Sequence, residues 1–255
     1  MNETIQPLSV CTDAPRAEEF CARFADVPVR VRALFGSTRA YCEDYLTDET
    51  PVLEVSLDGA DLLNERRINA AMKRENGRDP LSCPDEYMER LALLRKVSER
   101  LVYHGVLLFH GCAVAVGGKA YLFTAKAGTG KTTHGRLWAE HIPGCHILTG
   151  DKPFLLFRDG KVFVCGTPWR GKERYGTNEV LPLAGICILE RDSENHIERV
   201  SFDDAFPVLM KQCNIPKGAG AAGALRLLAM MKNAALYRLG CNMNEDAAWV
   251  SYRGI

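Results

Sequence analysis

The fold is decided by the stretch Tyr121-Leu-Phe-Thr-Ala-Lys-Ala-Gly-Thr-Gly-Lys-Thr-Thr-His134. Within it, the pattern Ala125-x4-Gly130-Lys131-Thr132 matches a Walker A loop with alanine at its first position. An apolar strand pattern precedes the loop and a helical pattern follows it, which is the context that a phosphate-binding loop requires. The stretch therefore predicts an α/β core in which a strand ends in the loop and a helix begins near Lys131.

The residue types of this loop suit phosphate chemistry. Gly128 and Gly130 can adopt positive φ, so backbone N–H groups can approach phosphate oxygens closely. The helix that follows adds the positive end of its dipole. The Lys131 side chain can reach the β- and γ-phosphates, and the Thr132 hydroxyl can ligate Mg²⁺. The alternative is a purely structural glycine-rich turn that binds nothing. We predict that the nucleotide is contacted by Ala125, Lys126, Ala127, Gly128, Thr129, Gly130, Lys131, Thr132 and Thr133.

The patterns in the rest of the chain predict a mixed α/β protein. Patterns of period two predict core strands at 106–109, 112–116, 120–124, 146–149, 154–157, 162–165, 181–189 and 236–239. Helical spacing and helix-ending residues predict helices at 84–103, 131–141, 202–212, 221–231 and 244–252. Before them, we expect strands at 29–34 and 51–57 and a surface helix or loop at 58–79. The prediction is a small N-terminal α+β lobe over residues 1–80 and a nucleotide-binding domain over residues 81–255.

Composition argues against two classes of partner. Lys plus Arg and Asp plus Glu both number 32, and no basic stripe points to nucleic acid or to a membrane surface. Residues 101–118 lack Asp, Glu, Lys and Arg, but His110-Gly111 and Gly117-Gly118 divide them into short apolar runs. Two buried strands therefore explain this segment better than a membrane span. The first residues lack the cationic start and apolar stretch of a signal peptide, so we expect a cytoplasmic protein.

Other candidate sites are weak. The 10 cysteines include no Cys-x-x-Cys pair, which is typical of reduced cytosolic thiols. The grouping His141-x3-Cys145-His146 lacks a source for the remaining ligands of a metal site. A second glycine-rich pattern, Gly218-x-Gly220-x-x-Gly223, follows a proline-containing helical stretch rather than a strand. We therefore interpret it as a loop that enters a helix and not as a dinucleotide fingerprint.

The segment from Phe109 to about Arg191 resembles the HPr kinase/phosphorylase family, whose fold is of the phosphoenolpyruvate carboxykinase-like type. The resemblance covers about a third of the chain and rests on the order of its pieces as well as on the loop. In sequence order, these are His110-Gly111, the loop at 125–132, Ile147-Leu-Thr-Gly-Asp151 and Gly166-Thr-Pro-Trp-Arg-Gly-Lys-Glu-Arg174. It implies a divergent member with a mixed-sheet P-loop core, whereas residues 1–80 contain nothing diagnostic of the family.

The resemblance implies roles for individual residues. Lys131 and Thr132 would hold the phosphates of ATP and Mg²⁺. Asp151 matches one member of an aspartate pair that assists Mg²⁺ binding and removes the proton from the accepting hydroxyl. His110 matches a histidine close to the transferring phosphate. The alternatives are structural roles, in which Asp151 starts a turn and His110 is a core histidine.

The chain departs from the family at the partner of Asp151, because Gly150 stands where the second acid is expected. Glu173 and Glu190 are candidate replacements. Three cations, Arg170, Lys172 and Arg174, lie on a glycine-rich loop beside Trp169. They suit an anionic group, either the γ-phosphate or a substrate, and we assign Arg170 a catalytic role. The alternative is a solvated loop.

Three functions compete at this point. The favoured one is an ATP-dependent kinase that phosphorylates a hydroxyl, either a serine of a protein or peptide or a small molecule. The second, motivated by Gly150, is a nucleotide-binding regulatory module with little or no turnover. The third is a carboxykinase-like lyase, but true carboxykinases are longer and carry further metal ligands. Because members of the HPr kinase family assemble through their catalytic domains, the resemblance also implies that a homo-oligomer could form.

Overall fold

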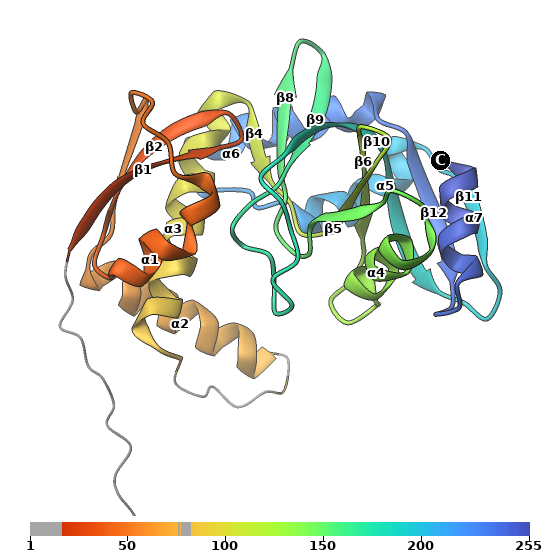
Figure 1. Ribbon diagram of the computed structural model, residues 1–255, viewed down its shortest axis with the longest axis horizontal. Helices are drawn as coiled ribbons and strands as arrows, with labels where there is room; N and C mark the ends of the chain where they lie inside the picture. The colour runs from red at the N-terminus through yellow and green to blue at the C-terminus, as the bar shows by residue number, and fades with distance from the viewer. Residues whose placement is uncertain (1–16, 76, 78–82) are drawn as a thin grey trace, which may run out of the picture.

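The computed structural model describes residues 17–75, 77 and 83–255. Figure 1 shows a small N-terminal lobe, coloured red to yellow, beside a larger core that is coloured green to blue. The described residues form a three-stranded sheet in the lobe and a nine-stranded sheet in the core. The chain is therefore α/β with a mixed core sheet, as the sequence predicted.

The lobe is built from β1 (Glu18–Phe24), β2 (Val27–Ala33) and β3 (Leu53–Ser56). β1 pairs with β2 in antiparallel fashion, and β2 pairs with β3 in parallel. Side chains alternate between buried and accessible along β1 and β2, as expected for a sheet with one face on a core. The expected strands at 29–34 and 51–57 are present as β2 and β3, whereas β1 was not predicted.

Helices cover this small sheet. They are α1 (Gly36–Tyr41), η1 (Glu43–Tyr45), α2 (Gly59–Glu75) and α3 (Asp85–Leu101), with η2 (Val102–His104) at the end of α3. The segment expected as a helix or loop after residue 57 is the helix α2. α3 packs against both α2 and the sheet, so the predicted domain boundary near residue 80 falls between two helices that contact each other.

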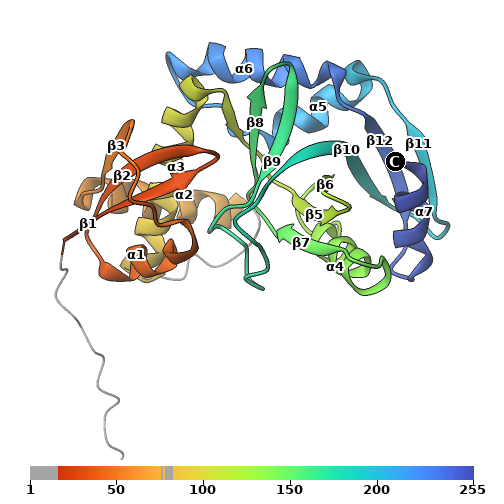
Figure 2. The same cartoon turned by 45° about the horizontal axis from the view of Figure 1, so that its top comes forward.

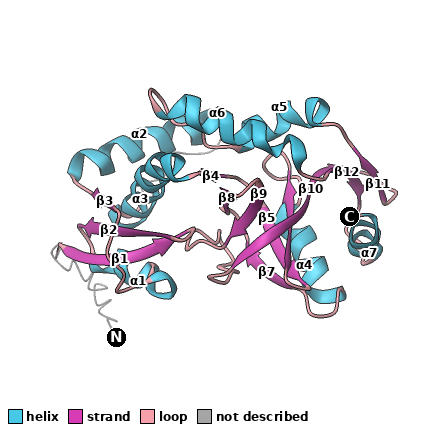
Figure 3. Cartoon of the chain, turned by 90° about the horizontal axis from the view of Figure 1, so that it is seen from above, coloured by secondary structure: helices cyan, strands magenta, loops and turns pink. Residues whose placement is uncertain are grey.

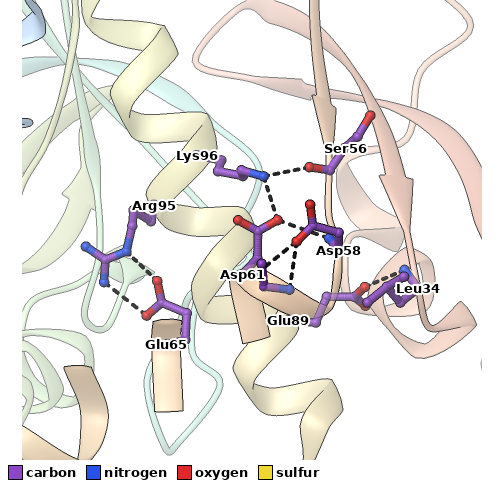
Figure 4. A network of polar contacts seen from close by, with 9 residues as sticks. Leu34, Ser56, Asp58, Asp61, Glu65, Glu89, Arg95 and Lys96 are labelled. Carbon is purple, nitrogen blue, oxygen red and sulfur yellow. Dashed lines mark hydrogen bonds and ion pairs between the residues drawn. The ribbon is translucent and has the colours of Figure 1, made fainter. Parts of the chain in front are cut away.

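A polar network ties α3 to the lobe (Figure 4). The Glu89 carboxylate accepts hydrogen bonds from the Leu34 N–H and the Thr38 hydroxyl. Lys96 Nζ donates to the Ser56 carbonyl at 2.9 Å, and it also pairs with a carboxylate of α2. Glu89 is fully buried, and this burial raises its pKa against the opposing effect of the hydrogen bonds. The contacts fix α3 as a wall between the lobe and the core.

The core sheet has the strand order β4-β8-β9-β10-β6-β5-β7, and β12 pairs with both β10 and β11. β10 is parallel to β6 and to β12, while the remaining pairs are antiparallel. The strands are β4 (Val106–Leu108), β5 (Cys112–Val116), β6 (Lys119–Thr124), β7 (His146–Thr149), β8 (Phe154–Arg158), β9 (Lys161–Cys165), β10 (Val180–Arg191), β11 (His196–Arg199) and β12 (Leu236–Cys241). Of these, only β11 was not expected.

Helices lie on both faces of this sheet (Figures 2 and 3). α4 (Lys131–His141) and α7 (Asp246–Gly254) cover one face, and α5 (Phe202–Gln212) and α6 (Gly220–Met230), followed by η3 (Met231–Asn233), cover the other. Successive residues of β5 divide between the two layers, because Val114 joins the α4 side and Ala113 and Ala115 join the α5 side. Burial on both faces explains the continuous apolar strands.

Several local predictions are confirmed. The apolar segment before residue 118 forms β4 and β5, and no helix of the described residues is long and apolar enough to cross a membrane. Gly117 and Gly118 form the turn between β5 and β6 with φ of +59° and +72°. The pattern that begins at Gly218 leads into α6, as expected for a loop that enters a helix.

The described residues contain no group of three His, Cys, Asp or Glu side chains that could hold a metal ion. His141 instead lies beside Glu140 and Glu245, and His146 pairs with Glu179 at 2.6 Å. None of the nine cysteines within the described part of the chain forms a disulfide bond.

Candidate phosphate-binding cleft

Sheet topology gathers the predicted site at one edge. β5 is antiparallel to both of its neighbours, so β6 and β7 run in the same direction. The loop after β6, Asp151 after β7 and His110-Gly111 before β5 therefore lie at the same edge. Two hydrogen bonds join them: the Thr124 hydroxyl donates to the His110 carbonyl at 3.0 Å, and the Gly111 N–H donates to the Asp151 carbonyl at 3.0 Å.

The loop between β6 and α4 has the backbone that its glycines permit. Gly128 has a φ of +81° and Gly130 a φ of +126°. A Cβ added at either position would meet no heavy atom within 4 Å among the described residues, so conformation rather than space requires glycine here. α4 then begins at Lys131, as predicted, and the His134 N–H donates to the Gly130 carbonyl at 2.9 Å.

The two polar residues that open α4 are held near the loop. The Lys131 ammonium donates to the Ala125 carbonyl at 3.1 Å, and only 8% of this residue is exposed. Burial lowers the pKa of Lys131, and the nearby Asp151 carboxylate acts in the opposite direction. The Thr132 hydroxyl lies 3.4 Å from the Gly150 carbonyl, to which it donates. Thr132 thus lies next to the segment that carries Asp151.

Arg191, at the end of β10, was not predicted as a site residue. Its guanidinium donates to the Gly128 carbonyl at 2.5 Å and to the Thr129 carbonyl at 3.3 Å. These contacts fix the carbonyl groups of the loop from outside. Because β10 is parallel to β6, the C-terminal ends of both strands lie at the same edge of the sheet. The sequence signal for Arg191 is a cation that follows the long apolar run of β10. Its position beside the loop could not be predicted without the strand order.

Asp151 and His110 form a close pair. His110 Nε2 lies 3.2 Å from Asp151 Oδ1, and Lys152 Nζ lies 3.8 Å from the same oxygen. Burial raises the pKa of Asp151, but the hydrogen bond from His110 and the charges of Lys152 and Lys131 outweigh it, so the net shift is downward. Asp151 is therefore a carboxylate at neutral pH, able to accept a proton or to ligate a cation.

His110, Asp151 and Lys152 line a cleft of about 560 Å³ between the core and the lobe. It brings together the predicted residues His110, Thr132, Asp151, Arg170 and Lys172. Lys152 was not predicted as a site residue, although it follows Asp151 directly. The lining also includes Tyr41, Tyr87, Leu91, Leu94, Gly150, Trp169, Gly171 and Glu173.

The three loop cations are not equivalent. The Arg170 guanidinium pairs with Asp44 of the lobe at 2.5 Å and lies over the ring of Tyr45. Lys172 is exposed and lines the cleft. Arg174 is exposed, has a φ of +55° and is not among the described residues that line the cleft. Of the three, Lys172 is thus the cation that faces the cleft without a lobe partner in the described residues.

The structure gives a steric reason for Gly150. A Cβ at this position would lie 2.7 Å from the Arg170 carbonyl oxygen, so an acid could not stand here unless the loop moved. Of the two candidate replacements, Glu173 lines the cleft. Glu190 forms an ion pair with Arg238 and lies outside the lining.

The donor set is compatible with Mg²⁺. The Thr132 hydroxyl and the Asp151 carboxylate are hard oxygen ligands, and Mg²⁺ is commonly bound through one or two protein oxygens together with phosphate oxygens and water. Such an ion would take its remaining ligands from phosphate oxygens and water.

Comparisons with known proteins identify no family. No protein-family profile matches the sequence, and no curated protein matches it. Among solved structures, the chain is similar to the HPr(Ser) kinase/phosphatase from Coxiella burnetii at 8% identity, over 58% of this chain and 95% of that chain, with a TM-score of 0.33. This is a distant structural likeness only.

Proposed function

We propose that the protein is an ATP-dependent phosphotransferase that transfers the γ-phosphate to a hydroxyl group. The observation that carries this proposal is the meeting of the loop and the acid–base pair: Thr132 of the loop and the Asp151–His110 pair line the same cleft. Phosphoryl transfer depends mainly on positioning and on neutralising charge, and this arrangement supports both.

Each group has a role in this proposal. The loop backbone and Lys131 hold the β- and γ-phosphates, while Arg191 keeps the loop in shape. When bound by Thr132 and Asp151, Mg²⁺ would neutralise phosphate charge. The acceptor oxygen attacks the γ-phosphorus, the bond to the β–γ bridging oxygen breaks, and ADP leaves. Asp151 takes the hydroxyl proton, and His110 orients its carboxylate.

Calorimetric titration with ATP and Mg²⁺ tests the nucleotide site. We expect Lys131→Ala to weaken binding by roughly tenfold or more, because a charge-assisted contact to phosphate is lost. Asp151→Asn should bind ATP within a few-fold of the wild type but should fail to transfer labelled phosphate to hydroxyl acceptors. If the folded wild type binds no ATP, the proposal is wrong. Equal losses of binding and transfer in Asp151→Asn would remove the proton-acceptor role.

One observation favours a second candidate, a nucleotide-binding regulatory module with little turnover. The Arg170 carbonyl occupies the space that a second acid at position 150 would need, which leaves Asp151 without that partner. ADP production separates the two functions. A kinase releases ADP in proportion to the phosphorylated acceptor, whereas a module binds ATP and leaves it intact with every acceptor offered.

A further inference from the structure

A second pocket, of about 330 Å³, adjoins the phosphate-binding cleft. We call it the side pocket. It lies among α2, α3, the end of β4 and the C-terminal end of α5, and it shares four lining residues with the cleft: Leu91, Leu94, His110 and Lys152. Its other lining residues are Glu65, Ile68, Asn69, Met72, Arg95, Leu108, Phe109, Lys211, Gln212, Cys213 and Asn214. The two spaces therefore meet beside the carboxylate of Asp151, which His110 and Lys152 both contact.

The walls of the side pocket are fixed by specific contacts. The end of α5 is attached to β4, because the His110 N–H donates to the Gln212 carbonyl at 2.8 Å and the Asn214 N–H donates to the Leu108 carbonyl at 2.9 Å. On the opposite side, the Arg95 guanidinium of α3 donates two hydrogen bonds to Glu65 of α2, as Figure 4 shows. The side pocket is thus built by four elements that hydrogen bonds hold in two pairs, α5 with β4 and α3 with α2, and it resembles a preformed ligand site.

The lining indicates what the side pocket would bind. Much of it is apolar, contributed by Ile68, Met72, Leu91, Leu94, Leu108 and Phe109. Glu65 and Arg95 neutralise each other and Lys152 pairs with Asp151, so Lys211 is the lysine of the lining that forms no ion pair within the described residues.

We propose that the side pocket binds the phosphoacceptor, a small alcohol with an apolar body and an anionic group. This inference rests on the proposed phosphotransferase function. The apolar body packs on the leucines of α3, and the anion lies near Lys211. The accepting hydroxyl then lies at the junction with the cleft, next to His110 and Asp151. A volume of this size suits a small molecule rather than the surface of a folded protein.

Substitution at the mouth of the side pocket tests the site. Ile68 lines it and is 37% exposed, so Ile68→Trp should fill space there without disturbing the core. Leu63→Trp is the matched control, because Leu63 is an exposed residue of the same helix and is not in the lining. Lys211→Ala removes a cation of the side pocket, and Lys217→Ala is its exposed control.

The probes are 3-phenyllactate, 3-phenylpropionate, which lacks the hydroxyl, and 3-phenylpropanol, which lacks the carboxylate. Ligand-observed NMR titration measures their binding. We expect both acids to bind the wild type and the two controls, and to bind Ile68→Trp and Lys211→Ala about tenfold more weakly. The neutral alcohol should bind the wild type about tenfold more weakly than the acids. Absence of binding by either acid, or equal binding to Ile68→Trp, would overturn the inference.

ATP calorimetry on the same proteins separates this inference from the proposed function. We expect Ile68→Trp to bind ATP as the wild type does, because Ile68 does not line the cleft. If ATP binds and neither acid does, the side-pocket inference falls while the proposed function stands. If the acids bind and ATP does not, the proposed function falls and takes the acceptor role with it.

Discussion

The charge of Asp151 is set by its neighbours rather than by exposure to water. Burial alone would favour its neutral form, yet the contacts from His110 and two lysines keep its pKa below the usual value. A carboxyl with a lowered pKa contributes stability above its unfolded pKa and loses that contribution as the pH falls through the folded value. Asp151 therefore stays charged across the neutral pH range, in the form that can accept a proton from a hydroxyl group.

His134 shows the opposite behaviour. It lies on α4 and is only 3% exposed, and its Nε2 is 3.0 Å from the Ser251 hydroxyl of α7. The Trp138 indole N–H donates to the same hydroxyl at 2.7 Å. His134 Nδ1 is buried without a partner among the described residues, so a second proton would meet no acceptor there. Burial lowers the pKa of His134 to about 4.

Stability should therefore fall as His134 is forced to take up a proton. The unfolded chain binds that proton near the ordinary histidine pKa of 6.5 and the folded chain near 4, so the contribution is complete above pH 6.5 and is lost towards pH 4. Between pH 7.5 and 5, we expect the wild type to lose about 2 kcal/mol of unfolding free energy beyond the loss in His134→Gln. Urea denaturation at both pH values measures the difference. His104→Gln, at an exposed position, should keep the wild-type response, and identical slopes for wild type and His134→Gln would contradict the assignment.

At the scale of elements, the glycine-rich loop between β6 and α4 depends on a strand that lies far from it in sequence. β6 ends in the loop, but β10 supplies Arg191, whose two hydrogen bonds hold the carbonyls of Gly128 and Thr129. Gly128 and Gly130 give the loop freedom to adopt positive φ and also to leave that conformation. The clamp from β10 offsets that freedom, so the loop is preorganised by an element outside the motif.

Arg191→Ala should weaken ATP binding by about tenfold, because part of the binding energy must then order the loop. Hydrogen–deuterium exchange of the amides at 128–130 should become faster, while the stability of the whole chain changes little. Arg191→Lys should recover part of the affinity, since a single ammonium can reach only one carbonyl at a time. Arg199→Ala, an exposed arginine on β11, is the control. Unchanged exchange at the loop in Arg191→Ala would show that the clamp is dispensable.

At the scale of the whole molecule, the lobe braces the loop that carries the cations. Arg170 pairs with Asp44, the Asn178 amide donates to the Asp44 carbonyl at 2.7 Å, and the Tyr45 hydroxyl donates to the Thr177 carbonyl at 3.3 Å. The ring of Trp169 lies 5.6 Å from that of Phe24 in β1. The lobe therefore shapes one wall of the cleft and also contributes α2 and α3 to the side pocket.

Asp44→Asn should loosen this brace without unfolding the protein. The Asp44 side chain is 59% exposed, so loss of the ion pair should cost no more than about 1 kcal/mol of stability. We expect faster hydrogen exchange at 169–176 and slower phosphate transfer, with ATP affinity close to that of the wild type. Asp48→Asn, at an exposed acid of the same lobe, should change none of these quantities. Unaltered exchange in Asp44→Asn would mean that the remaining contacts hold Arg170 without the ion pair.

The elements that the sequence predicted best are those whose signal is local. β5, β7, α4 and α5 have the expected bounds. Apolar residues mark β5, β7 and α5, whereas the glycine-rich loop before α4 and Pro143-Gly144 after it mark the ends of that helix. β1 and β11 were missed because charged residues interrupt both strands and β11 has only 4 residues, so neither shows a strong apolar pattern. Their strand conformation comes from pairing with a neighbour, which is a tertiary property.

The same division applies to the candidate site. The sequence alone predicted a glycine-rich loop between a strand and a helix, and it marked Asp151 as the acid after the next strand. Only the tertiary structure decided that His110 contacts Asp151, that Arg191 clamps the loop, that Arg170 pairs with the lobe and that a side pocket opens beside the cleft. The physical reason is range: dihedral preferences and hydrophobic period act over a few residues, whereas these contacts join segments whose meeting depends on strand order and packing.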